Sequence, residues 1–302
     1  MPLSTDPAAA PQPLLNYGGQ AVLEGVMMRG AHSIAVAVRA PDGAIQLQVR
    51  PLGKFYQGWW VRVPFLRGAL LLADALGLGF ESLTYSAQVQ LPEEKIGRGS
   101  LWFSFGLSLV IGVGLFMLLP AGIGQWFERG LALSSTWSNV AEGMVRLALL
   151  IGYLAVIGRM PDISRVFAYH GAEHKTISAY EAGAALDPPS VGRFSRYHPR
   201  CGTSFLVTLV AITVLLFALL GPMSLGMRLA TRILLLPIII ALGYEFLRWT
   251  GRHQNLRFAR WLSLPGVWTQ SLTTREPDEK MLEVAIAAFQ AMRSAEEQAN
   301  QA

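Results

Sequence analysis

The chain has 302 residues, of which 52% are hydrophobic and 15% are charged, and its formal net charge is +5. A soluble domain carries about 25% charged residues, so this composition argues against a soluble globular protein and indicates an integral membrane protein. In such a protein the positive charge indicates basic loops at one membrane face, and we expect no nucleic-acid partner.

The N-terminal third predicts a small β-structure after a disordered start. Residues 1–15 are rich in proline and alanine and lack the basic and apolar regions of a signal peptide. The glycines between Asn16 and Gly30 indicate tight turns or a close approach of the backbone to its neighbours. A hairpin follows, because Ser33–Arg39 and Ile45–Arg50 have strand patterns and flank the turn sequence Pro-Asp-Gly.

The segment Pro64–Gln90 predicts a helix that carries charges within an apolar pattern. Three charges (Arg67, Asp74 and Glu81) make it a poor membrane span, so it is interpreted as an interfacial helix. A helix of a soluble domain is the alternative.

Four segments are apolar enough to cross a bilayer, which takes about 20 residues. They are Leu101–Trp126, Val145–Ile157 with an extension back through Asn139, Phe205–Leu225 and Leu229–Leu247. The connections within each pair carry few charges, whereas the N-terminal segment, the central loop and the C-terminal tail are rich in Lys and Arg. The positive-inside rule therefore predicts two transmembrane hairpins, with both termini and the central loop in the cytoplasm.

The expected fold is a mainly α membrane protein with four transmembrane helices and a cytoplasmic α+β portion that includes the N-terminal β-hairpin. The predicted regions are residues 1–15 (disordered), 16–98 (cytoplasmic or interfacial), 99–158 (hairpin 1), 159–203 (cytoplasmic loop), 204–248 (hairpin 2) and 249–302 (tail). Pro277 and Asp278 in the tail predict the start of a helix that runs to about Gln298.

The central loop holds the sequence His170-Gly-Ala-Glu173-His174, which has the order His-x-x-Glu-His. A helix between Asp162, a predicted N-cap, and Gly183, a predicted C-cap, would place both histidines on one face. Two imidazoles at this spacing are a common pair of zinc ligands, and Glu173 could activate a water. The alternative is a pair of interfacial histidines that bond to carbonyl groups or lipid headgroups.

A third ligand has to come from another part of the chain. Glu181 lies about 10 Å along the helix from His174, too far to share its ion. Glu245, near the end of the last apolar segment, is the first candidate, since a carboxylate in that position is costly unless it is paired or bound to a metal. An ion pair with Arg248 or another basic residue is the alternative. His198 and Cys201, in the sequence His-Pro-Arg-Cys-Gly, are the other candidate ligands. The alternative for Cys201 is a small packing residue, and the alternative for His198 is a hydrogen-bond donor in a loop.

Two arginines are candidate substrate-anion ligands. Arg275 lies in Thr-Thr-Arg-Glu-Pro, just before the predicted C-terminal helix, and Arg200 lies between His198 and Cys201. Helix capping with a surface arginine is the alternative for Arg275.

Four motifs together resemble the YqhQ-like family of bacterial multi-pass membrane proteins, which are described as predicted metal-dependent enzymes of unknown function. The motifs occur in the same order over roughly residues 16–290 and are Gly18–Arg29, Tyr169–Lys175, His198–Phe205 and Leu272–Pro277. The resemblance implies a bacterial membrane location and a metal site at His170, Glu173 and His174. It implies no substrate.

The sequence therefore favours a zinc-dependent or other divalent-metal-dependent hydrolase at the cytoplasmic face of the inner membrane. Peptides, lipids and phosphoesters are all open as substrates. The alternative is a non-enzymatic scaffold or regulator, with a structural histidine cluster and a basic face that binds a membrane-protein partner or anionic lipid. A transporter is a third alternative, which the few charges counted within the expected spans, Arg232 and Glu245, do not favour.

Overall fold

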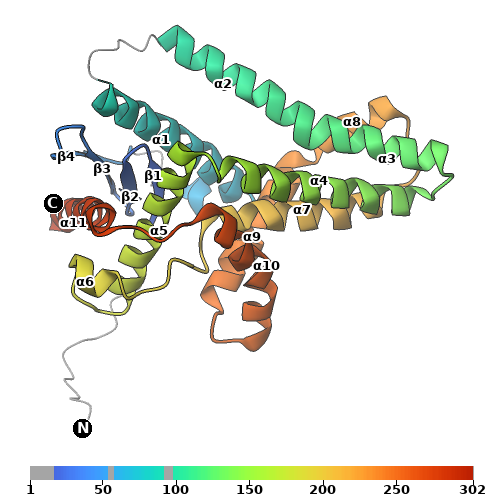
Figure 1. Cartoon of the computed structure of the whole chain (residues 1–302). Helices are drawn as coiled ribbons and strands as arrows, with labels where there is room; N and C mark the ends of the chain where they lie inside the picture. Colours follow the sequence, from blue (N-terminus) through green and yellow to red (C-terminus); the bar gives the residue numbers. More distant parts are fainter. Residues whose placement is uncertain (1–16, 54–57, 92–97, 302) are drawn as a thin grey trace.

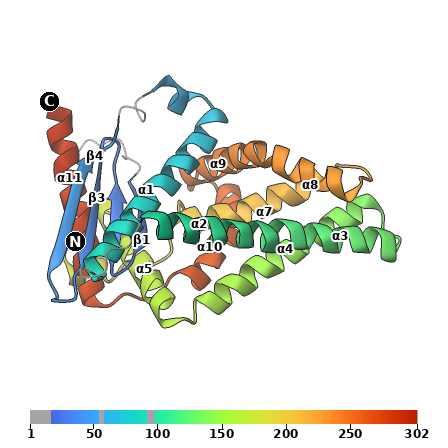
Figure 2. The same cartoon turned by 90° about the horizontal axis from the view of Figure 1, so that it is seen from above.

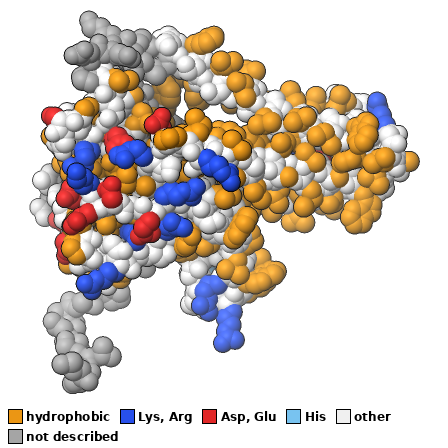
Figure 3. Space-filling model, viewed as in Figure 1, with side chains coloured by type: hydrophobic (Ala, Val, Ile, Leu, Met, Phe, Trp, Pro, Cys, Tyr) orange, Lys and Arg blue, Asp and Glu red, His pale blue; other side chains and the backbone are white. Residues whose placement is uncertain are grey.

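The computed structural model describes residues 17–53, 58–91 and 98–301, so the predicted disordered segment 1–15 lies outside the described residues. The described chain has a compact part around a small sheet and an elongated arm of apolar helices (Figure 1). Charged side chains gather on the compact part, and hydrophobic side chains cover the visible face of the arm (Figure 3).

The sheet has four antiparallel strands in the order β1 (Gly18–Val22), β2 (Gly25–Arg29), β3 (Ser33–Arg39) and β4 (Ile45–Pro51). The predicted hairpin is confirmed as β3 and β4, in which Arg39 pairs with Ile45. The glycine-rich segment was expected to form tight turns or close backbone contacts, and it forms β1 and β2 with such contacts to neighbouring residues. Gly25 is required there, because a Cβ atom would meet the carbonyl oxygen of Ala37 on the neighbouring strand.

Helices cover the sheet on both faces (Figure 2). On one face Ala35 and Ala37 pack against α11 (Glu279–Gln301), and on the other Val36 and Val38 lie in one core with residues of α1 (Leu66–Gln90). Because both faces are buried, β3 is apolar at nearly every position rather than at alternate ones. The helix predicted over residues 64–90 is confirmed as α1, which also reaches α9 (Leu236–Arg252) where Gly68 approaches Tyr244.

The arm contains α2 (Arg98–Val113), η3 (Gly114–Leu118, a π-helical segment), α3 (Leu119–Gly130), α4 (Ser135–Ile157), α7 (Gly202–Ala218), α8 (Leu225–Leu234) and α9. Among the described residues, two helices are long and apolar enough to cross a membrane, Trp102–Gly130 and Ser135–Ile157. Helices α8 and α9 meet at a bend of 45°. The two together would form a third span if the bent pair crosses the membrane as one unit. The 17-residue helix α7 is apolar but shorter.

Helix α4 begins four residues before Asn139, to which the predicted apolar segment extended. Glu142 and Arg146 lie within that segment but were not counted among the charges of the spans. The carboxylate and the guanidinium group lie four residues apart and form an ion pair, so their opposite charges compensate within the apolar helix.

The remaining helices are α5 (Pro161–Glu181), the short α6 (Pro188–Val191) and α10 (Arg257–Thr273), together with a 3₁₀ turn at Trp59–Arg62. Met160 rather than Asp162 occupies the N-cap of α5, since Pro161 takes the first helical position. Gly183, with φ of 68°, follows the end of α5 as predicted. The predicted tail helix is confirmed as α11, where the Asp278 carboxylate accepts a hydrogen bond from the N–H of Met281.

Candidate metal centre

Three side chains with metal-binding atoms meet where α5 faces the start of α7. His170 and His174 lie one turn apart on α5, with ring centroids 4.4 Å apart. The Nε2 atom of His170 lies 3.2 Å from the sulfur of Cys201. One ligand atom from each of these three residues lies within 4.8 Å of the other two. Two imidazole nitrogens and a thiol sulfur form a donor set that suits zinc.

Backbone carbonyl groups orient both imidazoles. The Nδ1 atom of His170 lies 2.9 Å from the carbonyl oxygen of Thr273, and that of His174 lies 2.6 Å from the carbonyl oxygen of Arg196. A carbonyl oxygen only accepts hydrogen bonds, so Nδ1 carries the proton in each ring and Nε2 keeps its lone pair. Metal-binding histidines are usually held in this way. Burial also lowers the pKa of His174, which favours the neutral form that binds metals.

Cys201 is the N-cap residue of α7 and is buried. Its sulfur accepts a hydrogen bond from the N–H of Thr203 at 3.4 Å and lies 3.1 Å from the Thr203 hydroxyl oxygen. The positive end of the helix dipole therefore faces the sulfur, a position that suits the negative charge of a metal-bound thiolate.

The close approach of Arg275 to α5 depends on Gly171. A Cβ atom at residue 171 would overlap the carbonyl oxygen of Arg275. The N–H of Arg275 donates to the carbonyl oxygen of Phe167 at 2.8 Å, which fixes the segment after α10 against α5. This contact brings the Thr273 carbonyl within reach of His170.

Gln270 connects α10 to the loop before α7 and is fully buried. Its amide oxygen accepts from the N–H of His198 at 2.9 Å, and its nitrogen donates to the carbonyl oxygen of His198 at 2.8 Å and the hydroxyl of Ser204 at 3.0 Å. The sequence did not assign Gln270 or Thr273 a role in the site. The available signal for a role in the site was that Gln270 and Thr273 lie in a polar segment next to an apolar one.

Glu173 is buried but does not belong to the cluster of ligand atoms. Burial raises the pKa of the Glu173 carboxyl to about 7, although the nearby His170 and a hydrogen bond from the N–H of Gly19 act in the opposite direction. A Cβ atom at residue 19 would lie 2.9 Å from the carboxyl carbon, so β1 admits this side chain only because residue 19 is glycine. Glu173 is therefore not a fourth ligand in this arrangement.

The structure does not bring Glu245 to the histidines. Its carboxylate accepts hydrogen bonds from the guanidinium group of Arg67, including one at 2.7 Å from Nε, and from the N–H of Phe65 at 3.2 Å. The predicted alternative, an ion pair with a basic residue, describes this contact, with Arg67 rather than Arg248 as the partner.

His198 lies near the cluster but faces Glu181. Its ring centroid is 5.7 Å from that of His174, and its Nε2 atom lies 3.4 Å from a carboxylate oxygen of Glu181. The guanidinium group of Arg200 also binds Glu181. His198 thus lies beside the cluster of His170, His174 and Cys201 rather than within it.

Arg275 has backbone partners in place of an open anion site. Its guanidinium group donates to the carbonyl oxygens of Ser271, Thr274 and Gly158, at 3.0 to 3.4 Å. These groups close the ends of α10 and α4, which is the capping alternative. The two predicted anion ligands, Arg200 and Arg275, therefore both have partners within the chain.

Comparison with known proteins places these residues in a family. The model of a family described as "Protein of unknown function (DUF1385)" matches residues 63–295. The chain is 32% identical over 289 residues to the protein named "Uncharacterized protein YqhQ" of Bacillus subtilis (strain 168), covering 90% of this chain and 91% of that protein. No solved structure matches. The YqhQ-like resemblance is thereby confirmed at the level of sequence, and the chain belongs to the DUF1385 family.

Proposed function

We propose that this protein is a zinc-dependent hydrolase at the cytoplasmic face of the bacterial inner membrane. His170, His174 and Cys201 are its metal ligands. The observation that carries the proposal is the convergence of their ligand atoms within 4.8 Å, with both imidazoles oriented by carbonyl groups. Structural zinc sites have four protein ligands, whereas catalytic sites have three and an open position.

The membrane part of the proposal rests on the apolar arm. Four crossings make up this arm, and both termini lie in the cytoplasm. The crossings are the continuous helix from α2 to α3, helix α4, helix α7, and the bent pair of α8 and α9. The turns between α3 and α4 and between α7 and α8 lie at the end of the arm far from the sheet, and the three ligands lie at the near end (Figure 1). This arrangement, together with the basic loops, supports a site at the cytoplasmic membrane surface.

Four residues near the ligands have a role in this proposal. A bound zinc ion supplies Lewis acidity and lowers the pKa of water at its open position. Glu173 is the general base, since it is a buried carboxyl group beside His174 and three residues after His170 on the same helix. Thr273 and Arg196 orient the imidazoles through their carbonyl groups, and Gln270 holds the loop that carries Cys201.

Elemental analysis of the full chain, purified in detergent without chelator, tests the proposal. We expect one zinc per chain in the wild type and loss of zinc in His170→Ala, His174→Ala and Cys201→Ser. His253→Ala is the matched control, because that imidazole lies at the end of α9, where it bonds to the carbonyl oxygen of Trp249 and stacks on the Trp249 ring. A wild-type protein without stoichiometric metal would refute the metal centre.

A second function has one observation in its favour. His174 and Cys201 are only 2% and 6% exposed, as in a closed structural site. In that case the protein is a scaffold or regulator that binds a membrane-protein partner or anionic lipid through its basic face. X-ray absorption spectroscopy at the zinc edge separates the two functions, because it reports the ligands that surround the ion. A hydrolase gives two imidazole ligands, one sulfur and one light atom that is not part of an imidazole, whereas a structural site that recruits His198 gives a third imidazole, which His198→Ala removes.

A further inference from the structure

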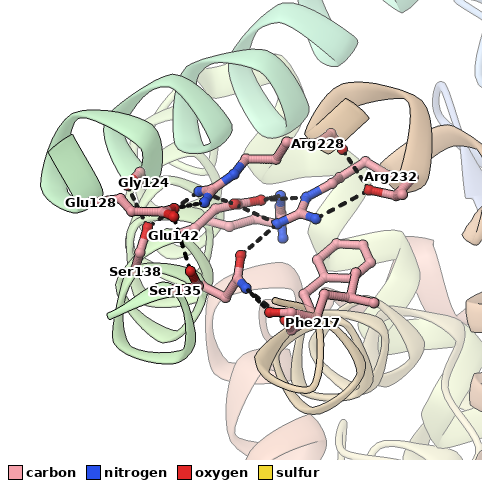
Figure 4. A network of polar contacts seen from close by, with 12 residues as sticks. Gly124, Glu128, Ser135, Ser138, Glu142, Phe217, Arg228 and Arg232 are labelled. Carbon is pink, nitrogen blue, oxygen red and sulfur yellow. Dashed lines mark hydrogen bonds and ion pairs between the residues drawn. The ribbon is translucent and has the colours of Figure 1, made fainter. Parts of the chain in front are cut away.

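A second polar cluster lies inside the apolar arm, far along the chain from the metal ligands. Arg228 and Arg232 of α8 face Glu142 of α4, with Arg232 Nη2 2.7 Å from a Glu142 oxygen (Figure 4). Arg228 also binds Glu128 of α3, and Arg146 binds Glu142 at 2.9 Å. Arg228, Arg232 and Glu142 are almost completely buried. Charged groups inside a membrane-spanning bundle are costly, and they are functional candidates by default.

The cluster has more positive than negative charge. Three guanidinium groups share two carboxylates among the described residues, which leaves one positive charge without a counterion. The Nη1 atom of Arg146 is buried and has no hydrogen-bond partner within the described chain. Its other two nitrogens donate to Glu142 and to the carbonyl oxygen of Phe116, which hold the guanidinium group in place. An anion beside Arg146 would supply both the missing charge and the missing acceptor.

A cavity of about 620 Å³ adjoins this cluster. It lies between α2, η3, α4, α7, α8 and α9, and most of its wall is formed by leucine, valine and aromatic side chains. Arg146 and Arg232 are the charged members of the described lining. Cavities of this size hold small molecules, and such a wall excludes a ligand that needs water around all of it.

The geometry points to an anionic phospholipid as the ligand, with an acyl chain in the cavity and its phosphate at Arg146. A free phosphate ion would leave the apolar wall without contacts, and a lipid without net charge would leave the positive charge uncompensated. A lipid phosphate meets both requirements through one molecule. The inference rests on the membrane insertion proposed above and is independent of the metal.

Native mass spectrometry of the full chain in a non-ionic detergent tests the assignment, with added phosphatidylglycerol, phosphatidylcholine or inorganic phosphate as probes. We expect one phosphatidylglycerol per chain, bound about tenfold or more tightly than phosphatidylcholine, because the choline cation of phosphatidylcholine cancels the negative charge that the cluster lacks. Arg146→Gln should lose this selectivity, and Arg146→Lys should keep most of it. Arg129→Gln, an exposed arginine at the end of α3, is the control.

A second pair of variants keeps the test decisive if Arg146→Gln fails to fold. Gly112 lines the cavity and has open space where a Cβ atom would lie, so Gly112→Phe fills the cavity without a clash at Cβ. Gly106 of the same helix has equal space but is outside the described lining, so Gly106→Phe is its control. Equal binding of both lipids, or phosphatidylglycerol binding that survives Gly112→Phe, would overturn the inference. Release of the protein from membranes by alkaline washing would instead refute the insertion on which it rests.

Discussion

The Nε2 atom of His170 lies 3.2 Å from the sulfur of Cys201, although the two residues are 31 positions apart in the chain. The contact joins the first helix of the central loop to the N-terminus of α7. A nitrogen and a sulfur at this separation form a hydrogen bond in the protein without metal, and they can both bind an ion placed between the three side chains.

The Cys201 sulfur should therefore be detectable in the metal site. In protein whose zinc is exchanged for cobalt, we expect a thiolate-to-metal charge-transfer band in the near ultraviolet, because sulfur donates electron density to the metal. Cys201→Ser should lose the band and the tight binding together. Its control is Thr203→Ser, which keeps a hydroxyl group beside the sulfur. The chain has one cysteine, so Cys201→Ser has no thiolate. A band that persists in this variant would show that the absorption does not come from a thiolate.

Gly171→Ala should weaken metal binding without touching a ligand. The added methyl group would displace the Arg275 carbonyl and, with it, the Thr273 carbonyl that orients His170. Changes to such orienting groups lower metal affinity about 10–100-fold. Competition with a zinc chelator measures the affinity of the variant.

Gly77→Ala is the control for this glycine, because it lies in helix α1 and has no atom near the added methyl group. It should leave the zinc affinity unchanged and stabilise the helix slightly. If Gly171→Ala binds zinc as tightly as the wild type, then the Thr273 carbonyl does not determine the position of the imidazole.

Glu245→Gln should retain full metal content. Its carboxylate joins α9 to Arg67 of α1, and burial of this pair is partial. We expect a loss of about 1 kcal/mol or less in the free energy of unfolding, as for other partly exposed ion pairs. Loss of zinc from a folded Glu245→Gln protein would return Glu245 to the set of ligands.

Glu296→Gln should make stability less dependent on pH. Burial alone would raise the pKa of the Glu296 carboxyl, but hydrogen bonds from the N–H groups of His32 and Ser33, the Ser33 hydroxyl and the His32 ring lower it below its usual range. A lowered pKa stabilises the fold at neutral pH, and that contribution is lost as the pH falls through the lowered value. Thermal unfolding between pH 7 and pH 3 should show a difference of about 1–3 kcal/mol that vanishes in acid.

Glu297→Gln is the neighbouring control, since Glu297 is exposed and bonded to Arg293 one turn away. It should follow the wild type at every pH. The thermal unfolding midpoint of Glu296→Gln could instead stay below that of the wild type by the same amount in acid. That result would show that packing, not charge, holds α11 to the sheet.

Local patterns predicted the features that depend on neighbours in the sequence. The turn residues at 41–43 gave the hairpin, and the spacing of His170 and His174 gave their shared face on α5. The strands β1 and β2 were missed, because glycine opposes strand propensity and the burial of this sheet on both sides removes alternation. Helix α10 was not predicted either, since Pro265 lies within it.

The choice among distant ligands could not be made from the sequence. Glu245 and Cys201 were both candidates at the same membrane face, and only the packing of α9 against α1 directs Glu245 to Arg67. The groups that orient the imidazoles are backbone carbonyls, which carry no residue-type signal. Gln270 was visible as a buried polar residue only once α10 lay against α7.

The π-helical segment η3 gives the first apolar helix one adjustable position. A π-helical turn holds one residue more than an α-helical turn, and the carbonyl oxygen of Phe116 within it accepts from Arg146 at 2.8 Å. Residue 120, four positions after Phe116, is a proline and has no N–H to donate to this carbonyl group. Removal of one residue between Gly114 and Leu118 would restore regular α-helix while α2 and α3 keep the faces they now present. If Leu115 were the residue removed, Pro120 would still lie four positions after Phe116, so Arg146 would keep both the Phe116 carbonyl and Glu142 as partners at the cavity wall.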